Sequence, residues 1–378
     1  MKSIINTEAS SRPYQADERK ITSLEAARRA MAELSTWPQY AVTPLRSLAG
    51  LAKADGLGAI FYKDEATRFG LDSFKALGGA YAAGLAARRL VVERFGVEPP
   101  MDPAAWAPEW TSNLTLTCAT DGNHGRSVAF GAVRYGCQCV VYMHERAPDE
   151  KAKAIEALGA TVIRTPGSYD DSVRVARAAA AANPDWLLVP DTTNDPNDPI
   201  PAQVMQGYGV MSLEIFDQLP GGEPPTHVFV QGGVGGLAAA IAGNFAEAYP
   251  DRRPFTVVVE PEQAACLLES ARLGRPAVIT GDLDTNMAML SCGEASPLAW
   301  TILKSRADAF MVIDDATALE WTTRLVKGEA GDPALDVGIS GAAGLAGLQA
   351  ALADPAMRAA FGLNQDSRVL VVGTEAGF

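Results

Sequence analysis

The stretch HVFVQGGVGGLAAAIAGNF, residues 227–245, does most to decide the fold of this chain. It begins with an apolar run at 227–230, which predicts a buried strand, and from Leu237 it continues as an alanine-rich helix. Four glycines in five positions, Gly232 to Gly236, join the two elements. Backbone N–H groups of such a loop, in front of a helix N-terminus, form a site for an anion such as a phosphate group. The plain alternative is a tight turn without a ligand.

Strand-like and helix-like segments alternate on both sides of this stretch. Helix-period segments separate the strands, and the longest covers residues 75–95 with Ser73 as its expected N-cap. A loop is expected at 192–202, where three prolines and two asparagines occur. The order predicts an α/β protein made of two doubly wound lobes with mostly parallel sheets and a ligand site between them. Further strands are expected at residues 59–63, 114–120, 139–144, 161–165, 186–191, 256–260, 309–313 and 368–372.

Composition limits the classes of function. The chain has 378 residues, 48% of them apolar and 20% charged, enough to bury the cores of two domains. A net charge of −13 disfavours nucleic acid or an anionic membrane as a partner. Five scattered cysteines indicate a reducing compartment, and the three histidines show no metal-binding spacing, so we expect no resident metal. With no signal-peptide or membrane-spanning pattern, a cytoplasmic location is expected.

The glycine loop taken alone also allows a different class of enzyme. Gly233-x-Gly235-x-x-Ala238 satisfies the dinucleotide fingerprint, and Glu260 ends a strand at about the right distance downstream. An NAD-dependent dehydrogenase is therefore one alternative. More than half of the chain precedes this fingerprint, however, whereas a dinucleotide site usually opens its own unit.

Two segments in the first half of the chain carry further chemistry. Ser73-Phe74-Lys75 places a lysine in the first turn of the predicted helix, where the helix dipole disfavours the ammonium form. A neutral lysine amine is what a Schiff base requires. The second segment, Thr120-Asp121-Gly122-Asn123-His124-Gly125, lies between a predicted strand and a predicted helix.

Lysine segment, asparagine loop and glycine loop, in this order, resemble the fold-type II pyridoxal-phosphate enzymes, which include the threonine and serine dehydratases. Ser73-Phe74-Lys75 is similar to their Schiff-base motif, Gly-Asn-His-Gly at 122–125 to their substrate-carboxylate loop, and 232–236 to their phosphate loop. The resemblance extends from about Val42 to Glu375. It implies a large cofactor-binding domain (1–85 and 205–378), a small domain (86–204) and a homodimer.

The same resemblance implies pyridoxal 5'-phosphate as the cofactor and an amino acid as the small-molecule substrate. It assigns Thr374 to the pyridine nitrogen of the cofactor. The expected cofactor-binding residues are Lys75, Asn123, Gly232, Gly233, Val234, Gly235, Gly236 and Thr374. The expected substrate-binding residues are Thr120, Asp121, Gly122, Asn123 and His124.

Within this group the chain is most similar to the 2,3-diaminopropionate ammonia-lyases. The dehydratases usually carry serine before Gly-Asn-His, and this chain has Asp121. Segments 205–208, 290–294 and 339–345 also resemble the ammonia-lyases, whereas 193–198 departs from their pattern. The resemblance implies α,β-elimination of ammonia from D- and L-diaminopropionate, an amino-acid catabolic reaction that gives pyruvate and ammonia.

Three residues are the candidate catalytic groups. Lys75 and Asp121 are expected to act as bases on opposite faces of the cofactor, and Asp191 as a second acid/base group. Cys266 and Cys292 lie in segments that could flank the site entrance, and buried thiols are favoured over a disulfide. Three alternatives stay open besides the dehydrogenase: a serine/threonine dehydratase, an ammonia-lyase for another β-substituted alanine, and a non-catalytic amino-acid-binding protein.

Overall fold

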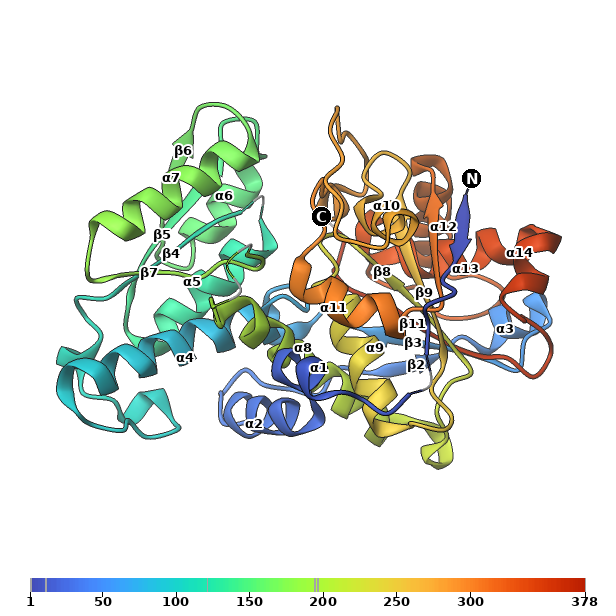
Figure 1. The fold of residues 1–378 in the computed structure, drawn as a ribbon, viewed down its shortest axis with the longest axis horizontal. Helices are drawn as coiled ribbons and strands as arrows, with labels where there is room; N and C mark the ends of the chain where they lie inside the picture. The colour runs from blue at the N-terminus through green and yellow to red at the C-terminus, as the bar shows by residue number, and fades with distance from the viewer. Residues whose placement is uncertain (1, 11, 121, 194, 196, 378) are drawn as a thin grey trace.

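The computed structural model describes residues 2–10, 12–120, 122–193, 195 and 197–377 and places them in two α/β lobes that lie side by side (Figure 1). Each lobe has its own sheet, and neighbouring strands are parallel everywhere except at two edges of the larger sheet. The predicted class, α/β with two lobes and mostly parallel sheets, is confirmed.

The larger sheet has seven strands, and its inner five are parallel. Residues Val228, Phe229 and Val230 of its central strand are fully buried, which explains why that strand is an unbroken apolar run. Both antiparallel edge strands are three residues long and were not predicted. Across the sheet the order is β1 (Ser3–Ile5), β10 (Ala309–Ile313), β9 (Phe255–Pro261), β8 (His227–Gln231), β11 (Arg368–Gly373), β3 (Ala59–Asp64) and β2 (Leu45–Ser47).

The smaller sheet consists of four parallel strands, and helices pack against it (Figure 1). The strand order is β6 (Thr161–Thr165), β5 (Gln138–His144), β4 (Thr115–Ala119) and β7 (Trp186–Leu188). The covering helices are α5 (Asn123–Tyr135), α6 (Asp149–Glu156) and α7 (Tyr169–Ala182).

Two long helices connect the lobes. Helix α4 (Ala76–Phe95) packs against α5 of the smaller lobe and against α8 (Ile200–Gln218), and α8 packs on α9 (Gly236–Ala248) of the larger lobe. The other helices of the described residues surround the larger sheet (Figure 1). They are α1 (Ala16–Ile21), α2 (Leu24–Leu34), α3 (Ala49–Asp55), α10 (Cys266–Leu273), α11 (Pro297–Arg306), α12 (Asp315–Lys327), α13 (Ile339–Ala353) and α14 (Pro355–Ala360), with short 3₁₀ turns such as η1 (Arg68–Gly70).

Two local predictions need correction. Helix α8 begins at Ile200, inside the segment expected to be a loop, with Pro201 in its first turn. Proline is compatible with that position because the first N–H groups of a helix have no intrahelical partner. Helix α4 takes Lys75 as its N-cap in place of Ser73, although Ser73 Oγ still accepts a 3.4 Å hydrogen bond from the Lys75 N–H.

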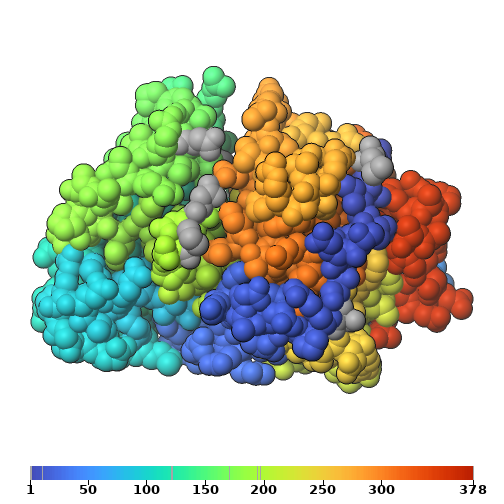
Figure 2. Space-filling view, in the orientation of Figure 1, coloured from blue at the N-terminus to red at the C-terminus, as the bar shows by residue number. Residues whose placement is uncertain are grey.

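The carboxyl ends of strands from both sheets meet at the seam between the lobes. Asn123, shortly after β4, contacts Glu375, shortly after β11. In Figure 2 the green smaller-lobe residues and the orange segment of the larger lobe abut, with a notch between them at the upper edge. In open α/β sheets ligands bind at such strand ends. Within the described residues, no helix has both the length and the apolar character needed to cross a bilayer.

Candidate active site

Lys75 lies at this seam, at the start of α4. Its ammonium Nζ is 3.1 Å from Asp191 Oδ2, a carboxylate that follows β7 of the smaller lobe. The backbone of Lys75 is tied to the smaller lobe as well, because Ser127 Oγ on α5 donates a 2.8 Å hydrogen bond to the Lys75 carbonyl. Lys75 and Asp191 are 116 residues apart in sequence, so only the fold brings these two predicted catalytic residues together.

The charges of this pair stabilise each other. Burial acts to raise the pKa of Asp191, but the charge of the Lys75 ammonium and its hydrogen bond to the carboxylate outweigh burial and hold that pKa at about 2. Burial likewise acts to lower the pKa of Lys75, yet nearby Tyr208 and the Asp191 carboxylate raise it above its ordinary value. The expectation that the helix N-terminus keeps this lysine neutral is therefore wrong for the free amine, because a carboxylate at hydrogen-bonding distance outweighs the helix dipole.

Two side chains place the glycine loop next to Lys75. A Cβ on Gly236 would lie 3.8 Å from the ring of Tyr208, and a Cβ on Gly233 would lie 3.1 Å from Cys292 Sγ. Both Tyr208 and Cys292 also interact electrostatically with the Lys75 ammonium. The loop and the lysine therefore line one site. The sequence shows Tyr208 only as part of segment 205–208, which resembles the ammonia-lyases, and it did not predict the position of Tyr208 beside Lys75.

The glycine loop has the geometry that its sequence predicts. It follows β8 directly and ends at Gly235, the N-cap of α9, whose φ of 103° favours glycine. Gly233 and Gly236 do not have a positive φ, so their backbone would accept another residue. A side chain at these positions would instead fill space beside Cys292 and Tyr208. Backbone N–H groups at a helix N-terminus, with no Cβ in front of them, can hold a phosphate group.

The asparagine loop brings Asn123 into contact with the segment that follows β11. Asn123 Nδ2 donates a 2.6 Å hydrogen bond to Glu375 Oε2, and the buried Asn123 Oδ1 has no hydrogen-bond partner among the described residues. Thr120 Oγ1 accepts hydrogen bonds from the N–H groups of Gly122 and Gly125, which shapes the turn into α5. Asp121 lies outside the described residues. Glu375 is a further site residue that the sequence did not reveal.

His124 stabilises the segment that leads to Asp191. Its Nε2 lies 2.8 Å from the Val189 carbonyl, which can only accept, so Nε2 carries the hydrogen. Burial lowers the pKa of His124, and it is therefore neutral at neutral pH. This bond holds the strand end that leads to Asp191.

Thr374 lies on the segment that follows β11. Its hydroxyl is 2.9 Å from Gln231 Nε2, and its carbonyl accepts a 3.1 Å hydrogen bond from the Phe74 N–H, next to Lys75. The residues of the site fit pyridoxal phosphate: Lys75 offers an amine for its aldehyde, the glycine loop offers N–H donors for its phosphate, and the buried Asn123 Oδ1 has no hydrogen-bond partner within the described residues.

A family model described as "Pyridoxal-phosphate dependent enzyme" matches residues 36–375. The chain belongs to this family. Its cofactor is pyridoxal phosphate, as the sequence predicted.

Curated relatives and solved structures give a narrower comparison. The diaminopropionate ammonia-lyase of Salmonella typhimurium is 40% identical over 74% of this chain and 70% of its own length, and that of Escherichia coli K12 is 37% identical over 89% and 84%. The crystal structure of the E. coli enzyme in complex with an aminoacrylate-PLP azomethine reaction intermediate matches with a TM-score of 0.87 and 34% identity, covering 99% of this chain and 93% of that one. The predicted resemblance to the diaminopropionate ammonia-lyases is confirmed.

The structure weakens the dehydrogenase alternative. Glu260, which would have to bind a ribose, is fully buried and accepts hydrogen bonds of 2.7 Å from the N–H groups of Leu267 and Leu268 at the start of α10. It is therefore occupied as a helix cap. Cys266 and Cys292 do not form a disulfide, and Cys266 Sγ lies 3.5 Å from the Gly233 carbonyl.

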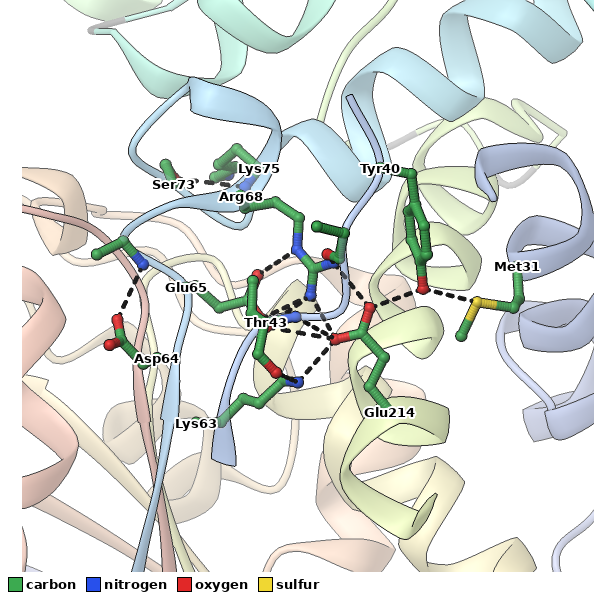
Figure 3. Close-up of polar contacts among 12 residues, drawn as sticks. Met31, Tyr40, Thr43, Lys63, Asp64, Glu65, Arg68, Ser73, Lys75 and Glu214 are labelled. Carbon is green, nitrogen blue, oxygen red and sulfur yellow. Dashed lines mark hydrogen bonds and ion pairs between the residues drawn. The ribbon is translucent and has the colours of Figure 1, made fainter. Parts of the chain in front are cut away.

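A buried charged cluster lies beneath the lysine loop (Figure 3). Arg68 contacts Glu65 at 2.8 Å and Glu214 at 2.7 Å, and Lys63 Nζ lies 2.7 Å from the same Glu214 carboxylate. Their side chains are at most 1% exposed. Two positive and two negative charges balance, and they join β3, η1 and α8 under the segment that carries Lys75.

Proposed function

We propose that this chain catalyses the elimination of ammonia from 2,3-diaminopropionate, in its D and L forms, so that one water and the diamino acid give pyruvate and two ammonia. The observation that carries the proposal is the Lys75–Asp191 pair, 3.1 Å apart beside the glycine loop, in a chain that resembles diaminopropionate ammonia-lyases over most of its length. Pyridoxal phosphate, when bound, supplies the electron sink that makes removal of the α-proton possible.

Lys75 performs two tasks in this proposal. Its Nζ would hold the cofactor through the cofactor's aldehyde, and the amine would be free to act as a base once a substrate amine is bound there instead. The freed amine then accepts the α-proton of the L substrate. Because the Asp191 carboxylate lies 3.1 Å from Nζ, it orients the amine and stabilises the ammonium that results.

The leaving β-amine needs a proton. Since the pKa of Asp191 is held at about 2, its carboxylate is ionised near neutral pH and stores no proton of its own. In the proposed mechanism the Lys75 ammonium is therefore the acid that meets the leaving amine, and Asp191 is the base that keeps this proton in place. Asp121 is the proposed base for the α-proton of the D substrate.

The binding roles follow the same geometry. We assign the phosphate to residues 232–236, the 3-hydroxyl of the cofactor to Asn123 and its ring nitrogen to Thr374. The substrate carboxylate is assigned to the loop from Thr120 to His124. The Asn123–Glu375 hydrogen bond supports this assignment because it fixes the amide at the seam.

We also propose the larger organisation of the protein. Residues 1–85 and 205–378 form the large cofactor-binding domain and 86–204 the small one, since each sheet falls within one of these parts. The protein is proposed to be a cytoplasmic homodimer, and the lack of a disulfide among its five cysteines agrees with a reducing compartment. Light scattering tests the dimer, because it must give twice the mass of the chain.

Borohydride and a substrate panel test the proposal. The purified protein should be yellow, and reduction should bleach it and leave a pyridoxyl group on Lys75. L- and D-diaminopropionate, L- and D-serine and L-threonine are then compared by release of the 2-oxo acid. Both diaminopropionates should be the best substrates by kcat/KM. A preference for serine or threonine would replace the proposal by a dehydratase, and a colourless protein that binds NAD would end it.

A further inference from the structure

Gln231 is the last residue of β8, directly before the glycine loop, and only 3% of it is exposed. Its side-chain Nε2 lies within hydrogen-bonding distance of four oxygens, three of them backbone carbonyls. They are Ser340 O at 3.2 Å, Gly341 O at 3.1 Å, Val372 O at 3.0 Å and Thr374 Oγ1 at 2.9 Å.

These contacts fix the orientation of the Gln231 amide. Carbonyl oxygens only accept hydrogen bonds, so the atom that faces three of them must be the NH₂ group. A flipped amide would place its own oxygen against three acceptors in a buried site. Gln231 Nε2 therefore donates, and the Thr374 hydroxyl is the acceptor at the shortest of the four distances.

The direction of this bond determines what Thr374 can offer to a ligand. A hydroxyl has a single hydrogen, and one that already accepts from Gln231 keeps that hydrogen for another acceptor. An unprotonated pyridine nitrogen carries a lone pair and can accept it. A protonated ring nitrogen is itself a donor, so the Thr374 hydroxyl would have to turn its hydrogen away from the ring while still accepting from Gln231.

We propose that Gln231 is a positioning residue that commits the Thr374 hydroxyl to donate a hydrogen bond and so keeps the ring nitrogen of bound pyridoxal phosphate unprotonated. The inference rests on the proposed function, which assigns Thr374 to that nitrogen. A neutral ring withdraws electrons less strongly than a protonated one. It therefore favours quick loss of a β-substituent over a long-lived carbanion, in agreement with an elimination.

The protonation state of the ring can be measured without turnover. Apoprotein is reconstituted with pyridoxal phosphate labelled with ¹⁵N in the ring, and its ¹⁵N signal, well separated for the two protonation states, is followed between about pH 6 and pH 9. In the wild type the nitrogen should stay unprotonated throughout. In Gln231→Met, which has a similar shape but no donor, the ratio of protonated to unprotonated ring should rise about tenfold at a given pH.

Gln349→Met is the matched control. Gln349 on α13 is also buried and also donates through Nε2, to Asp55, away from the site. Its loss should leave the ¹⁵N signal unchanged. A change as large as that in Gln231→Met would overturn the inference, because it would mean that loss of any buried glutamine suffices.

A second variant decides the matter if Gln231→Met does not fold. Thr374→Val removes only the hydroxyl, and Gln231 keeps its carbonyl partners. The ratio of protonated to unprotonated ring should again rise about tenfold at a given pH, and where Gln231→Met does fold, the double variant should show no additional change. A cofactor-bearing protein whose ring nitrogen is protonated in the wild type, or indifferent to both substitutions, would overturn the inference alone. A protein that binds no pyridoxal phosphate would overturn the proposed function, and the inference with it.

Discussion

Replacing Asp191 by asparagine should speed the attachment of pyridoxal phosphate to the apoprotein while it slows turnover. The pKa of Asp191 is about 2, against an ordinary 3.8, and this difference of about 1.8 units corresponds to roughly 2.4 kcal/mol. Burial of Asp191 opposes the shift, so its attraction to neighbouring positive charge is at least this large. Lys75 is the largest source of that attraction, and an interaction energy is the same for both partners.

The loss of this attraction must therefore appear at Lys75. Without the Asp191 carboxylate the pKa of Lys75 falls, and near neutral pH the neutral fraction of its amine should rise by at least about tenfold. Only the neutral amine attacks the cofactor aldehyde. Because the pKa of Lys75 is raised in the wild type, the neutral amine appears only as the pH increases, and the advantage of the variant should shrink at high pH.

Stopped-flow absorbance of apoprotein mixed with pyridoxal phosphate measures this rate. Asp185→Asn is the control, since Asp185 precedes the same strand but pairs with Arg94 at the surface, with about half of its side chain exposed. It should leave the attachment rate unchanged. An Asp191→Asn protein that attaches cofactor no faster than the wild type near neutral pH would refute the electrostatic argument. Unchanged turnover in that variant would remove Asp191 from the proposed mechanism.

Three further substitutions test other parts of the site. In Gly236→Asp the new Cβ would lie 3.5 Å from the nearest side-chain atom, so the protein should fold. Because a carboxylate repels the phosphate, a fluorescence titration should show at least about tenfold weaker binding of pyridoxal phosphate. Unchanged affinity would place the phosphate elsewhere. Asp121→Asn should lower kcat for D-diaminopropionate by roughly 100-fold and should lower kcat for L-diaminopropionate far less, as measured by pyruvate release. Equal losses of kcat on both enantiomers would make Asp121 a positioning residue. Arg68→Met leaves the buried Glu65 carboxylate without its cationic partner and leaves Glu214 with Lys63 alone. It should cost about 3–5 kcal/mol in urea unfolding of the apoprotein, and a loss below about 1 kcal/mol would contradict the role of the cluster.

Much of the fold could be predicted from periodicity alone. Strands 161–165 and 309–313 were placed with the bounds that the structure has. The second is a continuous apolar run because it is buried on both faces, whereas the first is a partly exposed edge strand. The edge strands β1 and β2 could not be found in this way, since three residues carry no usable period. The start of α8 was missed because proline was taken as a breaker without regard to its tolerance in a first turn.

Site residues could be predicted where they lie in a short recognisable sequence segment. They could not be predicted where only a contact with a residue distant in sequence brings them to the site. Lys75, Asn123 and the glycine loop each lie in a recognisable segment. Tyr208, by contrast, is one aromatic residue of a buried helix, and nothing in its spacing shows that it faces Lys75. Gln231 left a weak signal, a polar residue that ends an otherwise apolar strand just before the loop. Glu375 left none, because its partner Asn123 is 252 residues away.

The buried cluster gives a reason why these scattered parts keep their relative positions. Glu214 and Tyr208 are on the same helix, six residues or about 9 Å apart, and Arg68 is seven residues before Lys75. An Arg68–Glu214 contact at 2.7 Å, out of water, therefore fixes the helix of Tyr208 against the loop of Lys75 (Figure 3). Any other register would bury an unpaired charge, which is far more costly than a shifted apolar contact. The geometry of the site at Lys75 therefore depends on buried charged residues that do not themselves line the site.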